Sequence, residues 1–111
     1  MVLGMGGAME ILDELVARIR KVVQPERIVL FGSRARGTAS PESDFDILVI
    51  APSTLPRWRR TVPLYRVLAG VGISYDLVWW TSEEIEEWRN VQSHFITTVL
   101  REGKVLYERP S

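Results

Sequence analysis

Two aspartates spaced one residue apart, Asp44 and Asp46, lie at the start of an apolar run that extends to Ala51. Side chains two positions apart on a β-strand point to the same face, so these carboxylates should project side by side. Two like charges held that close repel each other unless a cation lies between them. The spacing therefore predicts a divalent-metal site at the start of this strand.

A Gly-Ser pair, Gly32 and Ser33, ends the preceding apolar run, and ten residues separate Ser33 from Asp44. Gly32 has no Cβ and lets a ligand approach the backbone, while the Ser33 hydroxyl can donate a hydrogen bond. If Arg34 opens a helical turn, the free N–H groups of that turn face a phosphate. Arg34 or Arg36 would neutralise the phosphate charge. These residues are the predicted nucleotide-binding set: Gly32, Ser33, Arg34 and Arg36.

Asp76 is the acidic residue inside a third expected strand, residues 74–80. If this strand pairs with the one that begins at Asp44, the three aspartates share a face. Carboxylate oxygens suit Mg²⁺, and two such ions about 3.5–4 Å apart stabilise an in-line displacement at phosphorus. Asp44, Asp46 and Asp76 are therefore the predicted catalytic residues and ligands of a two-metal Mg²⁺ site. Asp76 is also placed to accept the proton of an attacking hydroxyl.

Residues 32–46, with Gly-Ser, ten residues and then Asp-x-Asp, resemble the signature of the DNA-polymerase-β-like nucleotidyltransferase superfamily. The fuller string Gly-Ser-x-Ala-Arg-Gly…Ser-Asp-x-Asp is similar to that of the minimal nucleotidyltransferases, or MNT domain proteins, and the resemblance covers about residues 9–107. The resemblance implies an Mg²⁺-dependent enzyme that moves a nucleoside monophosphate, AMP from ATP, to a hydroxyl. It implies that Gly32 and Ser33 bind the triphosphate, Asp44 and Asp46 hold the metals, and Asp76 is the third carboxylate.

The same resemblance suggests a protein partner. Many such small proteins are encoded beside a helical HEPN-domain ribonuclease and act as its antitoxin, and some adenylylate a tyrosine of that toxin. The alternative is a binding module that neutralises its partner by complex formation, with exposed aromatics such as Trp58, Trp80 or Trp88 as the interface. Transfer to a small molecule is a third reading, although relatives with that activity usually carry an extra substrate domain.

The elements that must position these residues follow from periodicity and turn signals. They indicate a mixed α/β (α+β) domain, a small mixed β-sheet with helices packed on one face in a palm-like fold. Thr81–Glu84 fits a capping box, and Pro63 either starts or kinks the helix in which it lies. The expected helices are Met9–Val23, Leu55–Ala69, a short one after Thr81 and one from Phe95 to near Gly103, and the expected strands are Arg27–Phe31, Asp44–Ala51, residues 74–80 and Lys104–Tyr107.

The composition of the chain argues against some kinds of partner and some kinds of chemistry. Fourteen basic and fourteen acidic residues balance over 111 positions, which gives no strong signal for nucleic acid or membrane as the main partner. Arg57, Arg59, Arg60 and Arg66 are accordingly interpreted as a solvated helix face. The absence of cysteine excludes disulfides and thiol catalysis and is compatible with a cytoplasmic location. We expect residues 1–8 to be a disordered lead and residues 9–111 to form a single nucleotidyltransferase domain. Assembly into a homo-oligomer is left open.

Overall fold

The computed structural model describes residues 3–89 and 95–110, with side chains from Glu10 onward. Its centre is a four-stranded sheet in the order β3-β2-β1-β4, with β1 antiparallel to both neighbours and β2 parallel to β3. The mixed sheet predicted from the sequence is therefore confirmed. The strand bounds are β1 Arg27–Phe31, β2 Phe45–Ile50, β3 Tyr75–Trp80 and β4 Lys104–Glu108.

One helix precedes β1, and the others lie in the connections between the strands. The sequence predicted helix in each of these regions, but it placed one helix over Leu55–Ala69, where the structure has two, and several bounds differ. The helix bounds are α1 Leu3–Val22, α2 Ser33–Arg36, α3 Arg57–Arg60, α4 Val62–Val67, α5 Ser82–Trp88 and α6 Phe95–Glu102. The first helix begins at Leu3, six residues before Met9, and the division between a lead and a domain stays a prediction.

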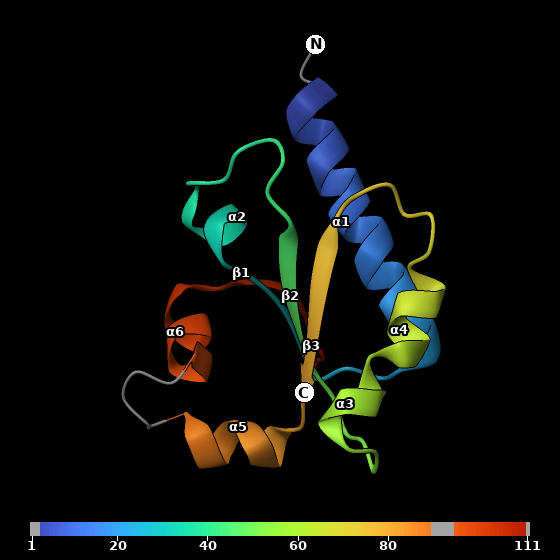
Figure 1. The fold of residues 1–111 in the computed structure, drawn as a ribbon, viewed down its shortest axis with the longest axis vertical. Coiled ribbons are helices and arrows are strands. Elements are labelled where there is room, and N and C mark those ends of the chain that lie inside the picture. Colours follow the sequence, from blue (N-terminus) through green and yellow to red (C-terminus); the bar gives the residue numbers. More distant parts are fainter. Residues whose placement is uncertain (1–2, 90–94, 111) are drawn as a thin grey trace.

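Helices cover both faces of the sheet in the described part of the chain, and the expectation of one covered face was wrong (Figure 1). The reason lies in β2, where Ile47 and Val49 point to one face and Leu48 and Ile50 to the other. A strand that is apolar on both sides has to be shielded on both. The sequence carried this signal, because these four residues are consecutive and all apolar.

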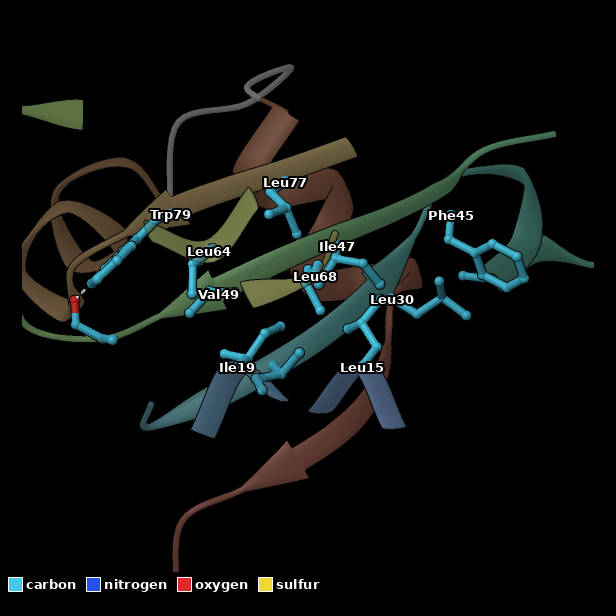
Figure 2. Close-up of a cluster of buried hydrophobic side chains, with 13 residues drawn as sticks. Leu15, Ile19, Leu30, Phe45, Ile47, Val49, Leu64, Leu68, Leu77 and Trp79 are labelled. Atoms are coloured by element: carbon cyan, nitrogen blue, oxygen red, sulfur yellow. Dashed lines mark hydrogen bonds between the residues drawn. The ribbon is translucent and has the colours of Figure 1, made fainter. Parts of the chain in front are cut away.

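The core on the α1 side joins the first helix to the crossover between β2 and β3. Figure 2 shows Leu15 and Ile19 of α1 and Leu64 of α4 in one buried cluster with Ile47 of β2. These four side chains have no solvent exposure. At the end of the cluster, the indole nitrogen of Trp79 donates a hydrogen bond of 2.9 Å to the carbonyl oxygen of Ala51.

The core on the α6 side is smaller. It consists of one buried face of α5 and α6 against the other face of the sheet, and its members are Val29, Leu48, Ile50, Trp80, Ile85, Ile96 and Val99. Trp80 is 4% exposed, so the prediction that it forms a partner interface was wrong, whereas Trp58 is 79% exposed. Trp80 is buried because it lies on the same face of its strand as Val78, beneath this helix layer.

The crossover between β2 and β3 shows whether Pro63 starts or kinks its helix. Two short helices replace the one expected, and Pro63 lies in the first turn of α4, where its missing N–H has no helical partner to lose. Arg60 ends α3 and is 6% exposed, which corrects its interpretation as a solvated residue. Its guanidinium donates to both carboxylate oxygens of Glu84, at 2.6 and 3.1 Å, and to the carbonyl oxygens of Leu55 and Trp79.

The predicted capping box is present at the start of α5. The Thr81 hydroxyl accepts from the Glu84 backbone N–H, and the Glu84 carboxylate accepts from the Thr81 N–H. Glu84 therefore both starts a helix and neutralises Arg60. None of the described helices combines the length and the apolar character needed to cross a bilayer.

Candidate active site

Three directly paired positions form a row across the sheet. Phe31, at the end of β1, is opposite Asp46, and Asp46 is level with Asp76 on the parallel strand β3. Because β1 runs against β2, its last residue meets the start of β2, and because β2 and β3 run together, their starts are adjacent. Directly paired side chains share a face. The sequence predicted that Asp46 and Asp76 would meet if their strands paired, and the register confirms it.

Gly32 directly follows Phe31 and lies against the Asp46 side chain of this row. Its backbone dihedral φ is +74° with ψ −157°, a region that residues with a side chain enter only with strain. A Cβ added at this position would collide with the Oδ2 atom of Asp46. The Gly-Ser turn and the second aspartate of the motif are therefore in direct contact, and that contact requires glycine. Ser33 follows as the first residue of α2, half-buried, and Gly37 ends the helical turn.

Asp46 lies where burial and like charges disfavour its ionised form. Burial raises its pKa above the ordinary 3.8, and the nearby charges of Asp76 and then Asp44 raise it further, while Arg36 lowers it. The ionised form of Asp46 is thus disfavoured by the protein alone. A bound cation would reverse that balance, because an opposite charge favours ionisation.

Asp44 and Asp76 are both more open to solvent than the core of the sheet, and Asp44 precedes the first residue of β2. The sheet register fixes the pair Asp46–Asp76, whereas Asp44 takes its position from the end of the preceding loop. Among residues 3–89 and 95–110, no three Asp, Glu, His or Cys side chains are gathered closely enough to hold one metal ion. The three-carboxylate metal site stays a prediction, although the aspartates are close enough for the charges of Asp76 and Asp44 to raise the pKa of Asp46.

Arg34 is directed at that loop. Its guanidinium donates to the carbonyl oxygen of Ser43 from Nε at 3.2 Å and Nη2 at 2.9 Å, and to that of Pro41 at 3.3 Å. The same group lies 4.2 Å from the centre of the Phe45 ring, a cation–π contact. Arg34 therefore braces the segment on both sides of Asp44. The nucleotide-binding role expected for Arg34 stays a prediction.

Arg36 is exposed and faces α6. Its Nη1 atom is 3.9 Å from Oε1 of Glu102, the outer limit of an ion pair. Its positive charge also lowers the pKa of Asp46. The charge of Arg36 therefore acts on the carboxylate row.

An open cavity of about 410 Å³ adjoins the row between the Gly32 turn and α6. Phe31, Gly32 and Arg36 form one wall, and four residues of the helix form the other: Phe95, Thr98, Val99 and Glu102. Sequence reasoning missed this helical wall. The signal was available in the spacing of Phe95, Thr98 and Glu102, which are three and four residues apart and so share a helix face.

The sequence of residues 9–106 matches the family model of the nucleotidyltransferase domain. The chain belongs to this family. The match spans nearly all of the described fold, from the middle of α1 into β4, and includes the turn, the row and the cavity. The chain is therefore a nucleotidyltransferase, as the motif predicted.

Relatives agree with this assignment. A protein of Methanocaldococcus jannaschii that carries the name "Putative protein adenylyltransferase" is 28% identical over 71 residues, 62% of this chain and 71% of that protein. The crystal structure of a toxin–antitoxin with AMP-PNP is similar with a TM-score of 0.64 and 25% identity, over 88% of this chain and 73% of that one. A mutant of the toxin–antitoxin MntA–HpeT has the same fold, with a TM-score of 0.61 and 21% identity over the same shares.

Proposed function

We propose that this nucleotidyltransferase moves AMP from ATP to a hydroxyl of a protein partner, with Mg²⁺ as the cofactor. The observation that carries the proposal is the contact of Gly32 with Asp46, level with Asp76. It combines a turn suited to phosphate with carboxylates suited to metal. The adenylyltransferase name of one relative and the AMP-PNP of another support AMP as the transferred group.

Each residue of the site has a proposed role. Gly32 and Ser33 bind the triphosphate, and Arg36, with Arg34 beside it, offsets the phosphate charge. Asp44, Asp46 and Asp76 would hold Mg²⁺, since they offer only oxygen donors and the charge on Asp46 is disfavoured without a cation. When bound, the metal neutralises charge on the phosphates and lowers the pKa of an attacking hydroxyl.

The proposed transfer is a single displacement at the α-phosphorus of ATP. The acceptor oxygen forms a bond to the α-phosphorus while the bond from that phosphorus to the bridging oxygen breaks, and pyrophosphate leaves. Asp76, exposed at the edge of the row, accepts the proton of the hydroxyl. We propose a tyrosine of a HEPN-type toxin as the acceptor and the cytoplasm as the location, in line with the toxin–antitoxin neighbours.

The test is incubation of the chain with α-labelled ATP, Mg²⁺ and the product of the adjacent gene. Label should appear on the partner, disappear with a chelator and return when Mg²⁺ is added back. Asp46→Asn and Asp76→Asn should abolish labelling, and Asp13→Asn, an acidic residue on α1, serves as the matched control. Equal labelling by all three variants would contradict the proposal.

A second function, neutralisation by binding alone, is favoured by one surface. Trp58 is 79% exposed, and the same crossover also carries the exposed apolar residues Leu55, Val62 and Tyr65. Apolar surface of this kind is typical of protein interfaces. Under this alternative, Asp46→Asn would still bind and silence the partner, while Trp58→Ala would not.

A further inference from the structure

We propose that the cavity between the Gly32 turn and α6 binds the nucleoside of the donor nucleotide, with the base stacked on Phe95 and the ribose hydroxyls bonded to Glu102. This inference rests on the proposed function and adds the site of the nucleoside to it. Residues outside the sequence motif would then select the nucleotide.

The cavity lies where a nucleoside would have to be. Gly32 contributes both to the cavity wall and to the contact with Asp46, so the cavity and the carboxylate row share a border. A nucleotide whose phosphates lie at the turn has its nucleoside a few bonds away. The volume of about 410 Å³ falls in the range of roughly 300–1,000 Å³ that small-molecule sites occupy. Figure 1 shows α2 and α6 on the same side of the sheet.

Phe95 gives the cavity an aromatic surface. Its ring packs against Phe31, with centroids 6.2 Å apart, and edge-on against Trp80, with centroids 5.7 Å apart. These contacts hold the ring in place, yet Phe95 remains 40% exposed and lines the cavity. A large apolar ring that packs against aromatic neighbours and is partly exposed in a cavity is a platform on which bases stack.

Glu102 and Thr98 supply the polar groups. Glu102 lines the same cavity on the same face of α6 as Phe95, about two turns further along, and its carboxylate accepts hydrogen bonds only. The two adjacent hydroxyls of a ribose are donors that match it. Thr98 lies between Phe95 and Glu102 and adds a hydroxyl. A tyrosine ring of the acceptor could stack on Phe95 as well, but it has one hydroxyl, which the reaction consumes.

The experiment compares two ligands that differ by the nucleoside. Calorimetric titration with AMP-PNP and with inorganic tripolyphosphate, both with Mg²⁺, should show that Phe95→Ala weakens AMP-PNP binding by roughly 5- to 150-fold, the effect of one lost stack, and leaves tripolyphosphate unchanged. Glu102→Gln should weaken AMP-PNP by about tenfold, as expected for a charged hydrogen bond. It should not weaken tripolyphosphate, because it removes a carboxylate that competes with phosphate for Arg36. Trp58→Ala, an exposed aromatic on α3, is the control and should change neither.

Phe95→Leu keeps an apolar side chain against Phe31 and removes the ring, so it tests stacking in a chain that folds. Equal loss of both ligands in the Phe95 and Glu102 variants, or unchanged AMP-PNP binding, would overturn the inference while the proposed function stands. Slower labelling of the partner at saturating ATP with unchanged AMP-PNP binding would place the acceptor in the cavity instead. A wild-type chain that binds neither ligand would contradict the proposed function itself.

Discussion

Two carboxylates at opposite ends of the same sheet meet opposite environments. Glu84, beyond the last residues of β3, is held by Arg60 and by the Thr81 N–H, and its pKa is lowered, chiefly by the hydrogen bond from Arg60. Asp46, near the first residues of β2, is partly buried beside two other aspartates, and its pKa is raised, chiefly by burial. The first carboxylate is stabilised in its charged form by the surrounding residues, and the second is destabilised by them.

That difference separates a carboxylate that holds the fold from one that is available for binding. Glu84 ties α3, the end of β3 and α5 together through Arg60. Asp46 costs stability in its charged form, which is the pattern expected where a ligand supplies the missing partner. Five changes of sequence or pH test this difference, and the first two bear on it most directly.

Asp46→Asn should separate activity from stability most sharply. Transfer should fall by on the order of a thousandfold, because the loss of a metal-binding charge removes about 4 kcal/mol of transition-state stabilisation. The melting temperature should stay the same or rise, since a disfavoured buried charge is gone. Label-transfer rates and thermal melts on the same sample measure both, and a clear drop in melting temperature would refute the contrast between Asp46 and Glu84.

Glu84→Gln should show the reverse. The buried guanidinium of Arg60 would lose its countercharge, and the free energy of unfolding should fall by about 2–3 kcal/mol. Urea titration measures this loss, and the rate of transfer per folded molecule should be unchanged. Glu86→Gln, which removes an exposed partner of Arg89, is the matched control and should cost less than about 1 kcal/mol.

Gly32→Ala should lower both the stability of the fold and the transfer activity. The strained backbone should lower the free energy of unfolding by about 1–3 kcal/mol, and the new Cβ should displace Asp46. Transfer per folded molecule should therefore fall together with stability. Gly70, also at positive φ but with open space where a Cβ would lie, is the control, because Gly70→Ala should cost stability alone. Equal activity in the Gly32 and Gly70 variants would show that Gly32 has no role in the active site.

Arg34→Lys should have a smaller effect confined to activity. Lysine cannot reproduce the forked contacts to the Ser43 and Pro41 carbonyls or the stacking on Phe45. We expect kcat to fall about tenfold through the position of Asp44. The KM for ATP should change little, because lysine keeps the positive charge that would offset the phosphate. A raised KM with unchanged kcat would instead show that the guanidinium of Arg34 acts on the nucleotide and does not position Asp44.

Glu84 and Asp46 should change the stability of the fold in opposite directions as the pH rises. Glu84 releases its proton at lower pH in the folded chain, so its contribution is complete above 4.5 and is lost as the pH falls below that value. Asp46 keeps its proton to higher pH when folded, so stability falls as the pH rises above 3.8. Unfolding titrations of wild type, Glu84→Gln and Asp46→Asn between pH 3 and 7 (roughly the range of carboxylate titration) should show two differences of opposite slope.

The sequence predicted most of what depends on neighbours along the chain. The motif, the capping box at Thr81 and the four strands are local signals, and each was confirmed. Burial of Arg60 and Trp80 could not be read locally, because it depends on which helix packs over which face of the sheet. The helical wall of the cavity escaped for the same reason, since it meets the Gly-Ser turn only in the folded molecule.

The parallel pairing of β2 with β3 has a consequence for chains of different length. Asp46 and Asp76 are adjacent because of strand register, and the crossover between them, residues 51–74, can lengthen or shorten without moving either. One residue inserted at the start of β3 would instead turn the third carboxylate to the opposite face. The contiguous motif therefore ends at Asp46, and Asp76 is better located in a related chain by counting along the strand than by counting from the motif.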